Sequence, residues 1–245
     1  MRVEQAMQIM TEMAPQEFRV TVDGTPQNSG DTIDIVWGVG KYFQRDDAIV
    51  SDTELLGLSG LMDYLIEHSR IENDFTVIDL GSGRGLFSVY LAREYPDSTV
   101  HAVDLCPPWF EKNYETGQIE PNDSIQYFDV SDQADNVDCH VGDLRDLLEI
   151  DFITDVGLLV NIWHHPGVLI DDRLEGVEDD ALKKVEMNLM NRFRYIISNV
   201  NKNQYDAYRS GHSYYNGKDQ QVEIVKEFFG HNQLIPELIV WRAKS

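Results

Sequence analysis

The sequence has 245 residues, of which 42% are hydrophobic and 26% are charged, proportions that are ordinary for a globular protein. It carries 43 acidic and 20 basic residues, so its net charge at pH 7 is −23. Phosphate backbones and anionic lipid surfaces repel such a protein. We therefore expect neither nucleic acid nor a membrane as a partner.

The excess of acidic residues has two explanations, which the sequence leaves open. The protein is either acidic but otherwise ordinary, or it is adapted to high salt, where screening weakens the repulsion between carboxylates. Residues 1–5 lack the blocks of a signal peptide, and no run approaches the roughly 18 apolar residues of a membrane span. Cys106 and Cys139 lack C-x-x-C spacing, which indicates reduced packing residues rather than a disulfide or a metal pair. A cytoplasmic location is expected.

Residues 1–13 are predicted to form a short amphipathic helix whose methionines pack against the rest of the protein. Residues 34–44 place aromatic side chains between glycines, which fits either a mobile flap over a ligand or an ordinary hydrophobic cap. We expect residues 1–50 to form an N-terminal helical extension or flap and residues 51–245 to form the main domain. Residues 51–68 begin with capping residues and predict the first helix of that domain.

A strand, a glycine-rich turn and a helix follow early in the main domain. Residues 75–78 are apolar, as in a buried parallel strand, and Asp79 comes directly after them. The turn Gly81-Ser82-Gly83-Arg84-Gly85 leads to residues 86–94, whose apolar positions have helical spacing. A second strand is predicted over residues 99–103. This order is typical of one half of a nucleotide-binding α/β fold.

The spacing of the three glycines narrows the expected ligand. A dinucleotide-binding turn has the pattern G-x-G-x-x-G and holds a pyrophosphate at a helix N-terminus. Here the pattern is G-x-G-x-G, and Leu86 follows it. Glycine is needed where a ligand approaches the backbone closely. Asp104, at the end of the second strand, can accept hydrogen bonds from a ribose diol. A ligand with a ribose and no phosphate fits both observations.

These residues resemble the motifs of the class I S-adenosylmethionine-dependent methyltransferases. The resemblance is carried by Val77-Ile78-Asp79-Leu80-Gly81-Ser82-Gly83-Arg84-Gly85, by His101-Ala102-Val103-Asp104-Leu105 and by Gly142-Asp143-Leu144, which follows a strand-like run over residues 137–141. It covers roughly residues 50–200. It implies an α/β fold with a seven-stranded, mostly parallel, doubly wound sheet.

The resemblance also implies roles for individual residues. The glycine turn would pack against the methionine part of S-adenosylmethionine, and Asp79 would orient the turn and the cofactor's ammonium group. Asp104 would hold the ribose hydroxyls, and Asp143 would face the adenine amino group. The predicted cofactor-binding residues are Asp79, Gly81, Ser82, Gly83, Gly85, Asp104, Leu105, Asp143, Leu144 and Asn161.

The fourth predicted strand, residues 156–162, ends beside the expected ligand. In open α/β sheets the ligand lies outside the carboxyl ends of the strands, where the strand order reverses. In the methyltransferase order the reversal lies between the first and fourth strands. His164 and His165 are therefore predicted as catalytic residues, because an imidazole can take a proton from an attacking hydroxyl or amine. They could also only shape the pocket. No third ligand stands at a recognisable spacing from them, so no metal site is predicted.

The segments after the second strand have several interpretations. The link over residues 105–136 is longer than a plain crossover, so we expect it to carry extra structure. That structure would contribute to a substrate pocket or an oligomer contact, or it would have no role. Residues 181–193 predict a helix, and residues 195–200 predict a fifth strand.

The C-terminal part is predicted as a loop followed by a hairpin. The tyrosine-rich residues 201–218 fit either a loop that closes over a substrate or an exposed, partly ordered loop. Residues 222–229 and 237–242 fit the terminal antiparallel hairpin of the same family, although the first of these segments also fits a helix.

Two classes of function follow. The first is an enzyme that transfers a methyl group from S-adenosylmethionine to a small-molecule acceptor, with S-adenosylhomocysteine as product. The alternative is a non-catalytic methyltransferase-like binding or scaffold subunit, against which the intact glycines, Asp79 and Asp104 count. At the end of the fourth strand the sequence departs from the amino-methyltransferase pattern, in which a polar residue is followed by Pro-Pro-aromatic, and this departure argues against DNA bases and protein glutamine as acceptors. No motif names the acceptor or the oligomeric state.

Overall fold

A computed structural model describes residues 1–13, 43–45, 48–50, 52–83, 85–104, 109–112, 119–122, 134–160, 162–163, 179–230 and 234–244. The helices are α1 (Val3–Met13), α3 (Asp52–Glu67), α4 (Leu86–Glu94), α5 (Leu144–Glu149), α6 (Asp179–Arg192), α7 (Lys202–Arg209) and the 3-10 helix η2 (Gly217–Asp219). The strands are β1 (Phe43–Arg45), β2 (Ala48–Val50), β3 (Thr76–Leu80), β4 (Thr99–Asp104), β5 (Trp109–Lys112), β6 (Ile119–Asn122), β7 (Val137–Val141), β8 (Thr154–Leu159), β9 (Phe193–Ser198), β10 (Val222–Phe228) and β11 (Leu238–Ala243).

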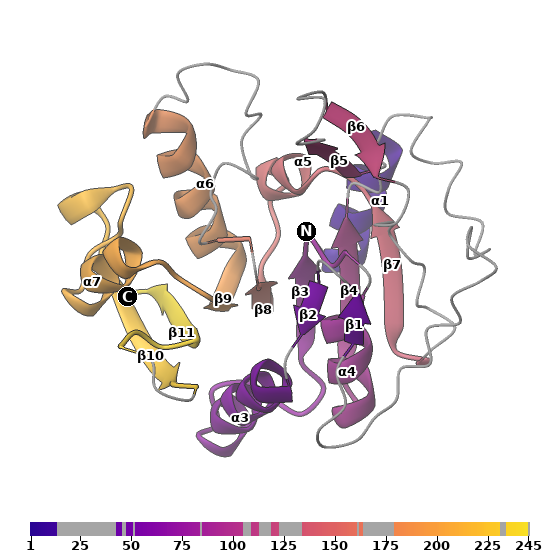
Figure 1. The fold of residues 1–245 in the computed structure, drawn as a ribbon, viewed down its shortest axis with the longest axis horizontal. Helices are drawn as coiled ribbons and strands as arrows, with labels where there is room; N and C mark the ends of the chain where they lie inside the picture. Colours follow the sequence, from indigo (N-terminus) through magenta and orange to yellow (C-terminus); the bar gives the residue numbers. More distant parts are fainter. Residues whose placement is uncertain are drawn as a thin grey trace.

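One seven-stranded sheet organises the described residues, in the order β10-β11-β9-β8-β3-β4-β7 (Figure 1). Strands β7, β4, β3, β8 and β9 run parallel, while β11 pairs antiparallel with β9 and with β10. The chain runs outward from β3 through β4 to β7 and then returns to β8 on the other side of β3. The order therefore reverses between β3 and β8. This is the strand order of the class I methyltransferase sheet, so the predicted fold class is confirmed.

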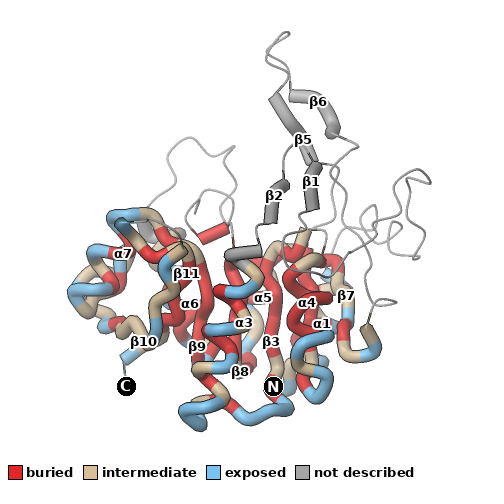
Figure 2. The backbone as a smooth tube through the Cα atoms, turned by 60° about the horizontal axis from the view of Figure 1, so that its bottom comes forward, coloured by how far each residue is buried: buried red, intermediate tan, exposed pale blue. Residues whose placement is uncertain are grey.

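Helices cover both faces of this sheet because its central strands are apolar on both sides. Ile78 and Leu80 of β3 pack into the cluster under α1, α5, α6 and α7, whereas Val77 packs into the cluster under α3 and α4. Figure 2 shows the central strands buried along most of their length. The ends of these strands are thereby held rigidly, which positions the loops that follow them.

The predicted central elements agree with the observed ones. The helix over residues 86–94 and the strand over residues 137–141 have the predicted bounds. The fourth and fifth strands begin and end two or three residues earlier than predicted, at Thr154–Leu159 and Phe193–Ser198. The apolar run continues past each strand because Val160, Ile162 and Val200 are buried beyond the last paired residues.

The prediction that residues 201–218 form a loop is wrong for its first half. Residues 202–209 form α7, and Asn201 begins it with a capping box: the Asn201 side chain accepts from the backbone N–H of Gln204, and the Gln204 side chain accepts from that of Asn201. Two tyrosines of the stretch, Tyr205 and Tyr208, are buried in the core rather than exposed to a substrate. The following hairpin β10–β11 is confirmed, and its first segment is a strand rather than a helix.

The N-terminal helix α1 packs against α5 and β7, with Met7 and Met10 buried and Met13 exposed. The division of the chain at residue 50 stays a prediction, since residues 14–42, which hold most of the predicted flap, lie outside the described residues. Within the predicted link over residues 105–136, β5 and β6 pair as an antiparallel hairpin. Across the described ranges, no helix is both long and apolar enough to cross a bilayer.

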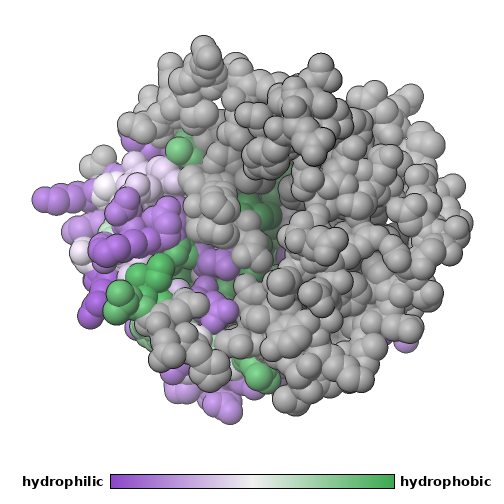
Figure 3. Space-filling model, in the orientation of Figure 1, coloured by the Kyte–Doolittle hydropathy of each residue, from purple (hydrophilic) through white to green (hydrophobic). Residues whose placement is uncertain are grey.

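The described surface near α7 and β10 is mainly hydrophilic, with one hydrophobic band between them, in the view of Figure 3. This agrees with the many charged residues in the sequence and the few large hydrophobic side chains that are exposed among the described residues.

Candidate functional site

The glycine turn joins the end of β3 to the start of α4. The backbone N–H groups of Gly81 and Ser82 donate to the Val103 carbonyl at 2.8 and 3.0 Å, which ties the turn to β4. Gly81, Gly83 and Gly85 have φ values of +74°, +54° and +70°. Residues other than glycine rarely adopt this left-handed region of φ, so the alternating glycines allow the backbone to turn here.

Two of these glycines create different kinds of space. A Cβ atom on Gly81 would lie 1.9 Å from the Ile162 Cδ1 atom, so Gly81 makes room for the segment that follows β8. A Cβ atom on Gly83 would meet no heavy atom within 4 Å among the described residues. Within the part of the chain that the structure describes, the turn thus leaves open space beside the Gly83 backbone, as a site for close approach of a ligand requires.

Asp104 lies directly against this turn. Its side chain is buried, and its Oδ2 atom accepts the Gly83 N–H at 2.8 Å. The Asp104 carbonyl in turn accepts the Gly142 N–H at 2.9 Å. Residues from the first, second and third sequence motifs are thereby brought together at the carboxyl ends of β3, β4 and β7.

Asp143 begins the short helix α5. Its Oδ1 atom accepts the backbone N–H of Arg145 at 2.8 Å, and the Arg145 guanidinium forms an ion pair with the same carboxylate. The neighbouring Leu144 is buried, with its Cδ1 atom 3.7 Å from the Cβ position of Gly81. An adenine role for Asp143 stays a prediction, and a ligand there would share the carboxylate with Arg145.

Asp79 is a buried carboxyl near the end of β3. Its Oδ2 atom accepts the Ser88 hydroxyl at 2.6 Å, and no lysine or arginine among the described residues forms an ion pair with it. Burial raises the pKa of Asp79 to about 7; the Ser88 hydrogen bond opposes this shift, and the charge of Asp104 adds to it. A cation placed nearby would stabilise the ionised form.

The Ser82 hydroxyl is a second polar group of the turn that a ligand could satisfy. Its Oγ atom is buried and has no hydrogen-bond partner among the described residues. Buried hydroxyls normally have a partner. This atom is therefore available to a hydrogen-bonding group of a bound molecule.

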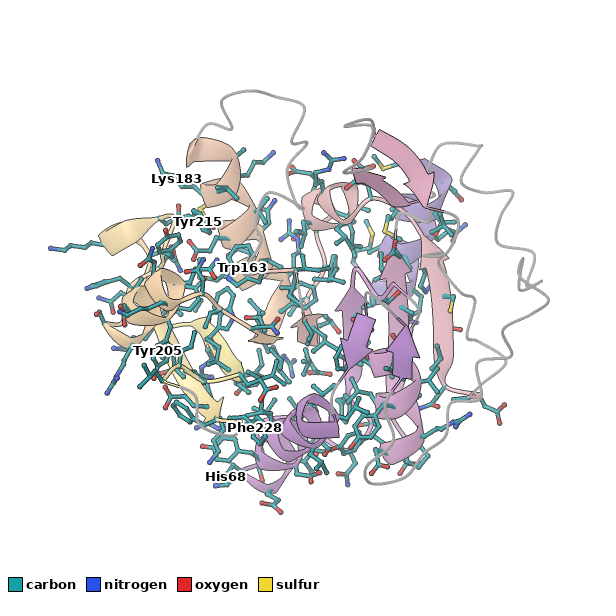
Figure 4. All side chains as sticks on the ribbon, viewed as in Figure 1. His68, Trp163, Lys183, Tyr205, Tyr215 and Phe228 are labelled. Atoms are coloured by element: carbon teal, nitrogen blue, oxygen red, sulfur yellow. The ribbon has the colours of Figure 1, made fainter. Side chains whose placement is uncertain are left out.

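The segment after β8 is anchored through Trp163, which is fully buried. Its indole N–H donates to the Tyr208 hydroxyl at 2.9 Å, and its carbonyl accepts from the Gln204 side chain at 2.8 Å. Figure 4 shows Trp163 beside Tyr215, and their ring centroids are 5.6 Å apart. These contacts hold the chain next to the predicted catalytic histidines. His164 and His165 themselves, with Asn161 and Leu105, lie outside the described residues.

The sequence analysis did not predict a role for Glu186, a buried carboxylate that holds Tyr208, the partner of Trp163. Glu186 of α6 is fully buried, and its oxygens accept from Tyr208 OH at 2.9 Å and from three backbone N–H groups. The backbone donors are Tyr214, Tyr215 and Asn216, at 3.1, 3.0 and 3.2 Å, and the Ser213 hydroxyl also donates. The signal was present, because Glu186 lies four residues after Leu182 and three before Leu189 on the predicted apolar face.

Comparison with known proteins gives partial matches. No protein-family model matches the chain. The (S)-coclaurine N-methyltransferase of Thalictrum flavum subsp. glaucum is 28% identical over 100 residues, which cover 40% of this chain and 26% of that enzyme. The match thus spans about a quarter of the plant enzyme's length.

Solved structures resemble the chain at low sequence identity. The crystal structure of WbdD is 15% identical with a TM-score of 0.48, and the match covers 79% of this chain and 40% of that one. The crystal structure of coclaurine N-methyltransferase bound to N-methylheliamine and SAH is 17% identical with a TM-score of 0.35, over 80% of this chain and 49% of that one. Both TM-scores are below 0.5, so the fold assignment rests on the strand order of the sheet.

Proposed function

We propose that this chain is a class I S-adenosylmethionine-dependent methyltransferase, which binds S-adenosylmethionine beside the Gly81–Gly85 turn and transfers its methyl group to a small molecule. The observation that carries the proposal is the convergence of acidic residues from β3 and β4 on a glycine turn with open space at Gly83. That combination suits a cationic ligand with a ribose.

The residues present fit this cofactor better than one with phosphates. S-adenosylmethionine carries a sulfonium and an ammonium cation, and Asp79 is a buried acid without a basic partner among the described side chains. Two acidic residues, Asp79 and Asp104, would repel a pyrophosphate at the same turn. The Ser82 hydroxyl and the open space beside Gly83 add a hydrogen-bonding group and room for close approach.

When bound, S-adenosylmethionine supplies an electrophilic methyl group on its sulfonium. In the proposed reaction Asp104 holds the ribose hydroxyls, and Asp79 faces the ammonium group. The protein accelerates the transfer mainly by holding the acceptor at attacking distance, which can contribute about 7–11 kcal/mol to lowering the barrier.

His164 or His165 removes the acceptor's proton where a hydroxyl or amine attacks. This role is supported by what precedes the two histidines in the chain. Ile162 contacts the glycine turn at Gly81, and Trp163 forms hydrogen bonds with two residues of α7. His164 and His165 directly follow Trp163 in the sequence, so the segment that contains them begins close to the glycine turn.

The acceptor we propose is a neutral or cationic small molecule. A net charge of −23 disfavours anionic acceptors and nucleic acids. The plant relative is named for N-methylation of coclaurine, a small molecule, which supports the same class of acceptor here. The scaffold alternative has no observation in its favour.

Calorimetric titration with S-adenosylmethionine and S-adenosylhomocysteine tests the proposal. We expect binding by the wild type, with loss of affinity in Asp104→Ala. Asp74→Ala is the matched control, since Asp74 is exposed and lies just before the amino end of β3, the opposite end of the strand from the glycine turn. A folded protein that binds neither compound would refute the cofactor assignment.

A second experiment separates the enzyme from the scaffold. The protein is incubated with S-adenosylmethionine and a set of small amines, phenols and thiols, and S-adenosylhomocysteine is measured. Acceptor-dependent formation of S-adenosylhomocysteine supports the enzyme. Tight cofactor binding without turnover on any acceptor class would favour the scaffold.

A further inference from the structure

A cluster of two histidines and an aspartate lies on β4 and the edge strand β7, outside the proposed cofactor site. The two strands are parallel, with His101 paired to Asp138 and Val103 paired to His140. Residues two apart in a strand share a face. His101, Asp138 and His140 therefore project from the same face of the sheet, the face on which α1 packs (Figure 1).

The distances within this cluster suit a metal ion. The His101 Nδ1 atom lies 3.1 Å from His140 Nε2 and 3.8 Å from Asp138 Oδ2, and one ligand atom from each residue lies within 4.8 Å of the others. Zinc–nitrogen bonds of about 2.0–2.1 Å at tetrahedral angles would separate two ligand atoms by about 3.3 Å. The two separations from His101 Nδ1 lie on either side of this value, so small side-chain rotations would bring both to it.

The charges around the cluster favour a cation. Burial disfavours the charged form of both imidazoles and lowers the pKa of each. A neutral imidazole is the form that binds metals. The charged groups that act on His101 are Asp138 and Glu4 of α1, and both are negative. The His101 Nε2 atom has no hydrogen-bond partner among the described residues, so no contact through that atom fixes the tautomer of His101.

The burial of the three residues provides both a rigid base and an entry path. His101 is fully buried, His140 is partly buried, and the Asp138 side chain is 65% exposed. Cys139, between the two β7 ligands, packs into the cluster on the opposite face of the sheet. Among the described residues Cys139 is therefore not a candidate fourth ligand, and a tetrahedral ion bound by the three side chains would keep one further coordination position.

We propose that His101, Asp138 and His140 bind a divalent transition-metal ion of the zinc type. The ion would join the edge strand β7 to β4. It would thereby stiffen the loop that follows β7, whose Gly142 N–H donates to the Asp104 carbonyl. This proposal does not depend on the proposed methyltransferase activity, since the cluster does not include any residue of the glycine turn.

Metal binding by the full chain tests the proposal directly. Protein freed of metal with a chelator is titrated with Zn²⁺ in competition with a chromophoric chelator, and with Co²⁺ while visible absorption is recorded. We expect one Zn²⁺ per chain and the absorption bands of tetrahedral Co²⁺. Asp138→Ala and His140→Ala should each lower Zn²⁺ affinity at least about tenfold, because even the loss of an outer-shell partner costs about 10–100-fold.

Two controls keep the result specific. Asp135→Ala removes an exposed aspartate from the turn just before β7, and His68→Ala removes an exposed histidine at the end of α3. Both should bind Zn²⁺ as the wild type does. Since Asp138 is exposed, its replacement leaves the fold intact, and circular dichroism verifies this. Absence of stoichiometric Zn²⁺ binding, or equal affinity in Asp138→Ala and Asp135→Ala, would overturn the proposal and leave a hydrogen-bonded histidine pair.

Discussion

The most informative perturbation of the candidate site is one methyl group added at Gly83. Its φ of +54° is strained for any other residue, but the added Cβ would meet no described heavy atom within 4 Å. The strain costs about 1–2 kcal/mol of folding free energy. For a protein of this size, that lowers the melting temperature by about 2–8 °C. Gly83→Ala should therefore fold.

The effect on cofactor binding should be larger than this strain suggests. If S-adenosylmethionine lies against the turn, the methyl group of Gly83→Ala occupies space that the cofactor needs. Forcing an extra methyl group into a packed contact costs about 1–3 kcal/mol. That free energy corresponds to a loss of affinity of about 5- to 150-fold.

Gly217→Ala is the matched control. Gly217 has a φ of +58°, a Cβ there would also meet no described heavy atom within 4 Å, and it lies in η2, a different part of the chain from the glycine turn. Both variants carry the same backbone strain, so a difference between them reports contact with the cofactor alone. The assay is calorimetric titration with S-adenosylhomocysteine at 25 °C. Equal affinities in the two variants would refute the placement of the cofactor at this turn.

Three further predictions concern stability. Glu186→Gln places an amide NH₂ among hydrogen-bond donors, so urea unfolding should show a loss of about 1–3 kcal/mol for each donor left without an acceptor, while Glu149→Gln, at an exposed helix end, should change little; equal effects would contradict the role of Glu186. Because the raised pKa of Asp79 means that the folded state keeps a proton which the unfolded state has lost, its contribution to stability falls as pH rises from about 4 to 7. The free energy of unfolding of Asp79→Asn should therefore rise relative to that of the wild type across that window, by at most about 4 kcal/mol. A constant difference in the free energy of unfolding between pH 5 and pH 8 would be incompatible with this reasoning. Finally, since 1 M salt shortens the Debye length to about 3 Å, KCl should raise the melting temperature of a protein with a net charge of −23, and an unchanged value would show that self-repulsion is negligible.

The central half of the sheet could be predicted because its signals are local. The glycines at 81, 83 and 85 lie within one turn, and the apolar runs over β3 and β4 lie within single strands. The strand order followed from the resemblance that these motifs carry. Strand ends were predicted less well, because Val160 and Val200 are buried for reasons of tertiary packing and extend each apolar run beyond its strand.

The helix α7 was missed because its tyrosines suggested a surface loop, although the capping pair Asn201 and Gln204 was visible in the sequence. The Tyr208 hydroxyl donates to Glu186 on another helix, and the Tyr205 hydroxyl donates to Glu227 of β10. No local pattern contains these contacts.

The sequence by itself determined the strand, glycine turn and helix around Asp79, because they depend on residues adjacent in the chain, and the type of fold followed from the resemblance that these motifs carry. Only the tertiary structure decided which distant residues meet. The Gly142 N–H, just after β7, donates to the Asp104 carbonyl at the end of the neighbouring strand β4. Ile162 fills the space left by the missing side chain of Gly81. His101 comes to lie beside Asp138 and His140 because parallel pairing brings together residues that are far apart in sequence.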